Sequence, residues 1–191
     1  MIKNPSQFPL NRNSRAILTI LNEGLDLSTL YEQEFKKYFL KNKIKLSKSQ
    51  IDLKKYDRVF LIAVGKSAGK MSEYASKKIN FQNGIIIVPT GVEPKLKKSI
   101  FKIYHGGHPL PNYNSFNSGK KLVLFLNETT KNDFVVFLIS GGGSALSVNP
   151  DSISLKDMIV VNDVLYNSGA NIMEIACMRK HLSLIKGGRL I

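Results

Sequence analysis

Four short runs rich in apolar residues divide the middle of the chain. They occupy residues 58–64, 84–89, 101–105 and 133–140, and the first and last are apolar almost throughout. Such runs are typical of strands that are buried on both faces of a parallel sheet. Apolar residues at helical spacing lie between them, over residues 68–79 and 113–127. This alternation predicts an α/β fold with a doubly wound, mainly parallel sheet and flanking helices.

The segments on either side of these runs read as helical. Apolar residues recur near helical spacing over residues 14–40, with an interruption at Gly24, and again over 155–168 and 172–185. Residues 41–55 are polar and basic and are expected to connect. We therefore predict a single domain over residues 1–191, with an N-terminal helical segment (1–48), a βαβ core (49–150) and a C-terminal helical segment (151–191). Its last residues follow a glycine pair, which led us to expect an incomplete C-terminus.

The charge of the chain raises the question of nucleic acid. Its formal net charge is +14, which is high enough for that function to be considered. The lysines are scattered over expected solvent faces and loops, however, and form no basic stripe interleaved with aromatic residues. This distribution favours a lysine-rich surface that attracts small anionic substrates, and it argues against a nucleic-acid partner.

Other classes are excluded by simple features. No apolar run approaches the roughly 18 residues that span a bilayer, and the N-terminus lacks the apolar segment of a secretory signal. We therefore expect no membrane partner. The single cysteine, Cys177, excludes an internal disulfide and suits a reducing compartment, so we predict a cytoplasmic location. We expect Cys177 itself to be a small core residue of its helix.

Two glycine-containing turns follow predicted strands, at the sheet edge where open α/β folds bind ligands. In the first, Gly65 permits a sharp turn, Ser67 can cap the next helix, and Lys66 can neutralise a transferred phosphoryl group. The alternative is an ordinary turn with an exposed lysine. The second turn contains three successive glycines flanked by serines, an arrangement whose backbone N–H groups form an anion-binding nest. Its residues are Ser140, Gly141, Gly142, Gly143 and Ser144.

Two further segments are candidates for the same site. Residues 105–112 read HGGHPLPN, a rigid loop that either binds substrate or packs the wall of the site. Its histidines, His105 and His108, lack a nearby third ligand, so a zinc site is not expected. Near the C-terminus, Arg179 and Lys186 fall on one face of the predicted helix together with Ser183. That face suits an anionic ligand, or it is simply a solvated basic face.

Taken in order, these motifs resemble the N-terminal domain of the type II glycerate kinases, also called glycerate 2-kinases. The resemblance covers nearly the whole chain, and its longest motif is the last one. The segments that carry it are GKSA (65–68), GHPLP (107–111), SGGGSA (140–145), SGA (168–170) and RKHLSLIKGGRL (179–190).

The resemblance implies a Rossmann-like domain that faces a second, smaller domain across an active cleft. It implies transfer of a phosphoryl group from ATP, with Mg²⁺, to D-glycerate, giving 2-phosphoglycerate. Lys66 takes the place of the catalytic lysine of the family, and the glycine turn would hold phosphate or the glycerate carboxylate. The phosphate- or substrate-binding residues implied are Gly65, Ser67, His108, Ser140, Gly141, Gly142, Gly143, Ser144, Arg179, Lys180 and Lys186.

The chain departs from the family pattern at a few positions. Asn112 stands where an aspartate is usual, and Ala176 stands where an asparagine is usual. By comparison with whole family members, we expect this chain to lack the second domain and the acidic segments that would hold the metal. We therefore predict that this chain alone is inactive or needs a complementing chain, and we assign no metal ligand. The alternative is a non-catalytic remnant that binds a nucleotide or a sugar phosphate.

Overall fold

The computed structural model describes residues 11, 13–18, 27–97 and 99–190. Part of the predicted N-terminal helix, residues 19–26, lies outside the described residues. The main elements in chain order are α2 (Leu27–Tyr38), β1 (Phe39–Leu40), β2 (Lys43–Lys45), β3 (Gln50–Asp52), β4 (Arg58–Val64), α3 (Ala68–Ala75), β5 (Asn83–Pro89), β6 (Phe101–Gly106), α4 (Tyr113–Asn127), β7 (Asp133–Ile139), α5 (Gly143–Leu146), α6 (Leu155–Asn167) and α7 (Ile172–His181).

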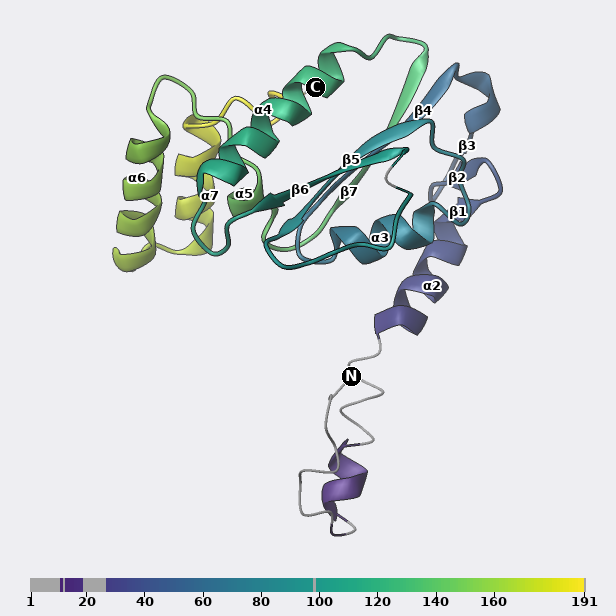
Figure 1. Cartoon of the computed structure of the whole chain (residues 1–191), viewed down its shortest axis with the longest axis horizontal. Coiled ribbons are helices and arrows are strands. Elements are labelled where there is room, and N and C mark those ends of the chain that lie inside the picture. The colour runs from purple at the N-terminus through teal and green to yellow at the C-terminus, as the bar shows by residue number, and fades with distance from the viewer. Residues whose placement is uncertain (1–10, 12, 19–26, 98, 191) are drawn as a thin grey trace.

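The four predicted strands form one parallel sheet in the order β6-β5-β4-β7. In chain order the strands therefore lie 3-2-1-4, the arrangement of the first strands in a Rossmann fold. Strands β5 and β6 lie on one side of β4, and β7 lies on its other side (Figure 1). Because β4 and β7 are parallel neighbours, the turns that follow them meet at one edge of the sheet. The predicted α/β fold, with its parallel sheet and flanking helices, is confirmed.

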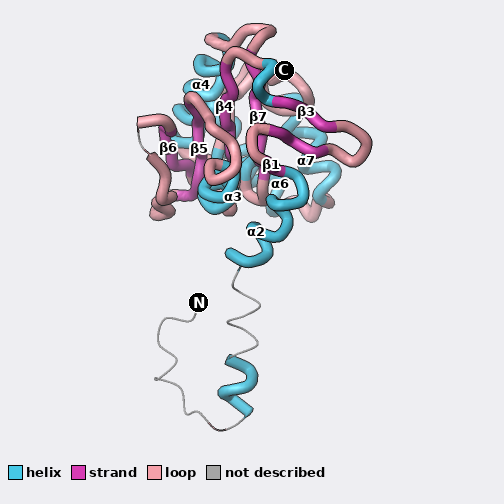
Figure 2. Tube along the Cα trace, turned by 90° about the vertical axis from the view of Figure 1, so that its right-hand side faces the viewer, coloured by secondary structure: helices cyan, strands magenta, loops and turns pink. Residues whose placement is uncertain are grey.

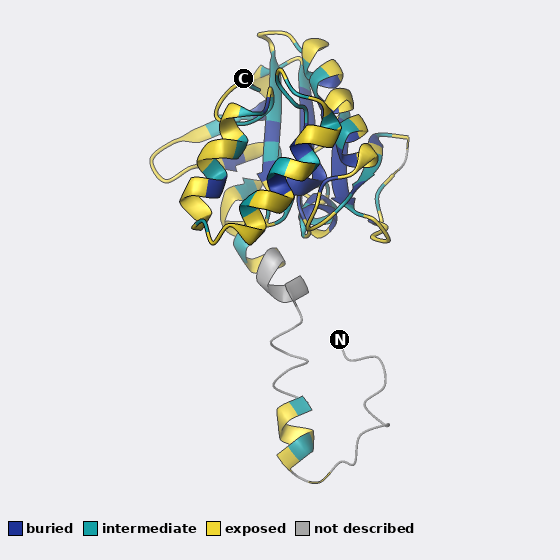
Figure 3. Ribbon diagram, turned by 90° about the vertical axis from the view of Figure 1, so that its left-hand side faces the viewer, coloured by how far each residue is buried: buried dark blue, intermediate teal, exposed yellow. Residues whose placement is uncertain are grey.

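Strand β4 is buried on both faces, as its apolar sequence predicts. Leu61 and Ala63 face a core that includes α3 and Phe35 of α2. Phe60 and Ile62 face the opposite core, against Leu122 and Phe125 of α4. The alternation follows from the two-residue period of a strand. Figure 3 shows the resulting band of buried residues along the central strands.

The segment expected only to connect forms a second, small antiparallel sheet. Strands β1, β2 and β3 pair in that order and are two or three residues long (Figure 2). Ile44 of β2 is buried between two exposed lysines and joins the α3-side core. A run this short carries too little periodicity to be separated from a polar connection by sequence alone.

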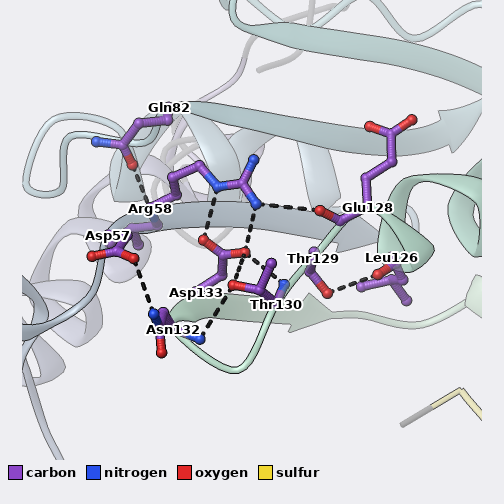
Figure 4. Close-up of polar contacts among 10 residues, drawn as sticks. Asp57, Arg58, Gln82, Leu126, Glu128, Thr129, Thr130, Asn132 and Asp133 are labelled. Carbon is purple, nitrogen blue, oxygen red and sulfur yellow. Dashed lines mark hydrogen bonds and ion pairs between the residues drawn. The ribbon is translucent and has the colours of Figure 1, made fainter.

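An ion pair fastens β4 to β7 at their starts (Figure 4). The Arg58 guanidinium donates from Nε and Nη2 to the two carboxylate oxygens of Asp133, at 2.8 and 2.7 Å. Asp133 also accepts from the backbone N–H of Thr130 at 2.7 Å. This hydrogen bonding, with that of Arg58 first, holds the pKa of Asp133 well below its ordinary value of 3.8. This ion pair lies at the opposite end of the strands from the edge that carries the two glycine turns.

Helices α6 and α7 lie side by side beyond α5, at the far end of the molecule from the small sheet (Figure 1). They expose several apolar side chains, among them Ile172 and Met173 of α7, which are 72% and 75% exposed. Ile139, at the end of the edge strand β7, is also 72% exposed. This end of the molecule is therefore packed less completely than the centre of the sheet.

Candidate functional site

The two glycine turns lie side by side at the carboxyl ends of β4 and β7. Backbone hydrogen bonds join them directly: Lys66 N–H donates to Gly141 O at 2.9 Å, and Ser140 N–H donates to Val64 O at 2.9 Å. The backbone N–H of Ser67 donates to the Ser140 hydroxyl at 3.1 Å. The sheet thus brings together two motifs that are more than 70 residues apart in sequence.

Two of these glycines are required by the local geometry. Gly65 has φ of +134°, and a Cβ there would lie 2.1 Å from Ser140 Oγ and 2.6 Å from Ser140 O. Gly142 has φ of +90°, and a Cβ there would lie 2.9 Å from His108 Cδ2. Both backbones occupy a region that side chains disfavour, in space that another residue already fills. The close contact of the two turns therefore depends on these glycines.

Lys66 and His108 meet above Gly142. From the position of a Cβ on Gly142, Lys66 Cγ would be 3.2 Å away and His108 Nε2 3.1 Å away. Partial burial, with the positive charge of Lys66 second, lowers the pKa of His108 below 6.5. His108 is therefore neutral near pH 7 and can accept a hydrogen bond, while Lys66 supplies the positive charge. Both side chains are exposed at this end of the site.

The loop of residues 105–112 thus reaches the site through only one of its two histidines. His105 points elsewhere, with Nε2 3.1 Å from both Val92 O and a Glu93 carboxylate oxygen. Asn112 caps α4: its side chain accepts from Ser115 N–H at 3.0 Å and from Gly107 N–H at 3.2 Å. Asn112, which stands where the family usually has an aspartate, therefore caps the N-terminus of α4 and ties it to the loop.

Arg179 stands on the opposite wall, on α7, and two residues of α6 hold it. Its Nε donates to Asn162 Oδ1 at 2.6 Å, and its guanidinium stacks over the Tyr166 ring at 4.9 Å. These contacts fix the side chain and leave its terminal nitrogens for another partner. Sequence reasoning missed both supporting residues, although Asn162 stands out as a polar residue that follows four consecutive apolar ones, at 158–161.

Lys186 lies near Arg179, as predicted, but the two residues are not on one continuous helix. The helix expected to continue to Ile185 ends at His181, and the chain then pairs briefly with residues before α6. Ser183 forms a β-bridge with Pro150, and Leu184 N–H donates to Asn149 O at 2.8 Å. Lys186 Nζ donates to Ser147 O at 3.0 Å. Burial, with the nearby Arg179 second, lowers the pKa of Lys186 to about 8.

A cavity of about 580 Å³ lies between the glycine turn and α7. Two buried polar atoms beside it have no hydrogen-bond partner among the described residues: Arg179 Nη2 and Ser147 Oγ. Among the described residues, no aspartate or glutamate lines the cavity. The predicted site residues that line it are His108, Ser140, Gly141, Gly142, Gly143, Ser144, Arg179, Lys180 and Lys186.

The remaining predicted residues, Gly65, Lys66 and Ser67, form the adjoining turn. Cys177, expected in the core, is instead exposed on α7. The apolar spacing of this helix is weak, so its faces could not be assigned from sequence. Within the described part of the chain, no helix is long and apolar enough to cross a bilayer.

The donor set of the site suits an anion and not a metal ion. Mg²⁺ takes oxygen ligands, chiefly carboxylates and phosphates. The described residues contain no group of three or more histidine, cysteine, aspartate or glutamate side chains that could hold a metal. The residues present therefore do not fit Mg²⁺, and we assign it no ligand. Backbone N–H groups, a fixed guanidinium and lysines do fit the oxygens of phosphate or carboxylate.

Fold and site together define a Rossmann-like domain with a cavity at its topological switch point whose donor groups suit an anion. Comparison with known proteins gives the family. Residues 18–191 match the family model described as Domain of unknown function (DUF4147), and the chain belongs to this family. It is the N-terminal domain family of the glycerate 2-kinases, as the motifs led us to expect.

The individual relatives agree with this assignment. The chain is 40% identical to a glycerate 2-kinase of Pyrococcus horikoshii over 134 residues, covering 70% of this chain and 30% of the relative. It is 39% identical to a D-glycerate 2-kinase of Thermotoga maritima over 138 residues, covering 70% and 32%. A glycerate 2-kinase of Picrophilus torridus is 31% identical over 195 residues, covering 100% and 44%.

Solved structures give the same result for the fold. A crystal structure of glycerate kinase from Thermotoga maritima superposes with a TM-score of 0.64 and 38% identity, covering 70% of this chain and 33% of that one. A crystal structure of a Pyrococcus horikoshii protein gives a TM-score of 0.70 at 37% identity, covering 78% and 34%. The chain spans between 30% and 44% of the length of the relatives named above.

Proposed function

We propose that this chain supplies part of the active site of a glycerate 2-kinase. The reaction moves the γ-phosphoryl group of ATP to the 2-hydroxyl of D-glycerate. The bond from the γ-phosphorus to the β–γ bridging oxygen breaks, a bond from phosphorus to the 2-hydroxyl oxygen forms, and the hydroxyl proton is released. The observation that carries the proposal is the cavity itself. The glycine turn 140–144 and the cationic side chains of Arg179, Lys180 and Lys186 line it, and no aspartate or glutamate of the described residues does.

The exposed end of the site is suited to the transferring phosphoryl group. Lys66 would neutralise charge on that group, and the turn from Ser140 to Ser144 would contact its oxygens. Phosphoryl transfer depends mainly on positioning and on electrostatic stabilisation, so a lysine beside a rigid glycine turn provides the chemistry needed. Neutral His108, next to Lys66, can accept a hydrogen bond from a hydroxyl group of the substrate.

The remaining parts of the proposal concern what acts with this chain. We propose that ATP and D-glycerate are its ligands, and that a further domain or a complementing chain completes the cleft. The cytoplasmic location expected from the single cysteine belongs to the same proposal. A non-catalytic nucleotide- or sugar-phosphate-binding module is the second candidate, favoured by the lack of a cavity-lining carboxylate for Mg²⁺ among the described residues.

Calorimetric titration of the purified chain with ATP and with D-glycerate, separately, tests this proposal. We expect both to bind, and Lys66→Met to weaken ATP binding about tenfold through loss of a charged hydrogen bond. Lys70→Met is the matched control, since Lys70 lies one turn further along and pairs with Glu73 at 3.0 Å. Failure of both ligands to bind would overturn the proposal.

Turnover separates the two candidates. The same samples are assayed for 2-phosphoglycerate with both substrates and Mg²⁺ present. Product that disappears in Lys66→Met and persists in Lys70→Met identifies the kinase. Binding of both ligands without product, even when the rest of a family member is added as a separate chain, identifies the non-catalytic module.

A further inference from the structure

The two ends of the cavity differ in how far they are covered. At one end the lining residues His108 and Gly141 are exposed to solvent, and so is Lys66 on the adjoining turn. At the other end Ser147 is 2% exposed, and Arg179 and Lys186 are each partly buried. Ser144, Arg179 and Lys186 line both this cavity and a second, very small one. A ligand therefore meets an open, backbone-built surface at one end and a covered group of cations at the other.

The covered end contains buried polar atoms that have no hydrogen-bond partner among the described residues. Arg179 Nη2 and Ser147 Oγ are both buried without a partner, and leaving such groups unpaired costs free energy. The two cations, Arg179 and Lys186, lie close enough for one to lower the pKa of the other. No acidic side chain in the described part of the chain lines the cavity to balance them. A bound anion would satisfy both the charge and the hydrogen bonds.

The geometry points to the carboxylate of D-glycerate as the anion at the covered Arg179–Lys186 end, with the phosphoryl group of ATP at the Lys66 end. This assignment rests on the proposed function and divides its cavity between the two substrates. The planar fork of arginine matches the two oxygens of a carboxylate. Contacts with Asn162 and Tyr166 already hold that fork in place.

The size of the substrates supports the same division. Glycerate is small enough to enter the covered end, whereas ATP must extend out of the cavity and so needs the open end. Gly142, beneath Lys66, and Ser144, beside Arg179, are two residues apart, so their Cα atoms are at most about 7 Å apart. The 2-hydroxyl of a glycerate held by its carboxylate can therefore lie next to a phosphoryl group at Lys66.

Titration with D-glycerate and with D-glyceramide, its neutral amide, tests the assignment in the purified chain. We expect the wild-type chain to bind glycerate at least about tenfold more tightly than glyceramide, because a hydrogen-bonded charge contributes more than a neutral group. In Arg179→Lys, glycerate binding should weaken about tenfold. Binding of glyceramide and ATP should stay within about twofold, so the preference for the charged ligand largely disappears.

The control is the same substitution ten residues on. Arg189→Lys changes an arginine whose partner is the partly exposed Asp151, at 2.6 Å, and should leave the preference intact. If Arg179→Lys does not fold, as judged by circular dichroism, Tyr166→Leu serves instead. That variant removes the stacked ring and should weaken glycerate binding a few-fold while glyceramide binding is retained.

Each other outcome overturns a specific statement. Loss of ATP binding with normal glycerate binding in Arg179→Lys would place nucleotide phosphate at the covered end. Equal losses for glycerate and glyceramide would show that Arg179 does not recognise charge. A wild-type chain that binds no glycerate would overturn the assignment together with the proposed function. Normal glycerate preference with ATP binding unaffected by Lys66→Met would overturn only the phosphoryl end of that function.

Discussion

The two walls of the cavity are built in different ways. The glycine-turn wall (residues 140–144, with the adjoining turn 65–67) continues directly from two paired strands, the buried β4 and the partly buried edge strand β7, and backbone hydrogen bonds fix it. The α7 wall (Arg179, Lys180 and Lys186) depends on side chains, and α7 exposes much of its apolar surface. The first wall can therefore be formed by this chain alone to high precision, whereas the second has few contacts that hold its helix.

This difference matches the roles proposed for the two walls. A phosphoryl-transfer site needs donors fixed in place before the reaction, because stabilisation of the transferring group depends on their positions. A rigid strand-end turn provides such donors. Recognition of a small carboxylate needs few, strong side-chain contacts, which Arg179 and Lys186 supply. Each wall can be tested separately, because each relies on different residues.

The largest effect is expected at Gly65, on the glycine-turn wall. Gly65→Ala would place a Cβ 2.1 Å from Ser140 Oγ, on a backbone with φ of +134°. We expect a loss of about 3 kcal/mol or more in the free energy of unfolding, from steric overlap and backbone strain together. Urea unfolding followed by circular dichroism measures it.

Gly141→Ala is the control for this experiment. A Cβ at Gly141 would have no atom within 4 Å, and its φ lies outside the positive range, so stability should change by less than about 1 kcal/mol. Equal losses for the two variants would mean that the turns are not locked together as described. The loss in Gly65→Ala would then reflect only a general intolerance of glycine turns to alanine.

The sequence was sufficient to predict the glycine-turn wall. The strand before each turn is a continuous apolar run, and its end could be placed within one residue, at Val64 and Ile139. Parallel strands have their carboxyl ends at one edge, so two such turns could be expected to share a site. The order of the strands, which makes β4 and β7 neighbours, follows from no local pattern.

The cationic residues of the α7 wall were predicted, but the backbone path and the contacts that place them were not. Arg179 and Lys186 were identified as a cationic pair, yet by assuming a helix that in fact ends at His181. Lys186 reaches its place through the bridge of Ser183 to Pro150, a contact between segments more than 30 residues apart. Non-local contacts of this kind leave no periodic signal, and neither does the support of Arg179 by Asn162.

An intermediate effect is expected on the α7 wall, as a pH dependence of glycerate binding. The pKa of Lys186 is lowered to about 8, so this cation loses its charge as the pH rises through that value. Glycerate binding should weaken about tenfold between about pH 7 and pH 9, since the protonated fraction falls by that factor. Calorimetric titration across this range measures it.

Lys186→Arg is the matched variant, because an arginine stays charged throughout this range. Its binding curve should be flat between about pH 7 and pH 9. Stability should change in the opposite sense to binding in the wild-type chain: the pKa of Lys186 is lower in the folded state than its ordinary value of 10.5. The cost of burying its charge is therefore relieved as the pH rises. A wild-type binding curve as flat as that of Lys186→Arg would remove Lys186 from the site.

The smallest effect is expected far from both walls, at the ion pair that fastens β4 to β7. Asp133→Asn removes the carboxylate that accepts two hydrogen bonds from Arg58. We expect a lower urea midpoint near pH 7, with ligand binding changed little because the ion pair lies at the other end of the strands. Asp57→Asn, which affects a single exposed hydrogen bond from Asn132, is the control and should shift the midpoint less.

The pH dependence of this effect has a definite sign. The pKa of Asp133 is lower in the folded chain than its ordinary value of 3.8. The ionised carboxylate therefore stabilises the fold above that value, and this contribution is lost as the pH falls toward the lowered pKa. The difference in midpoint between wild type and Asp133→Asn should accordingly shrink below about pH 4. A difference that persists in acid would mean that Asp133 acts through packing and not through its charge.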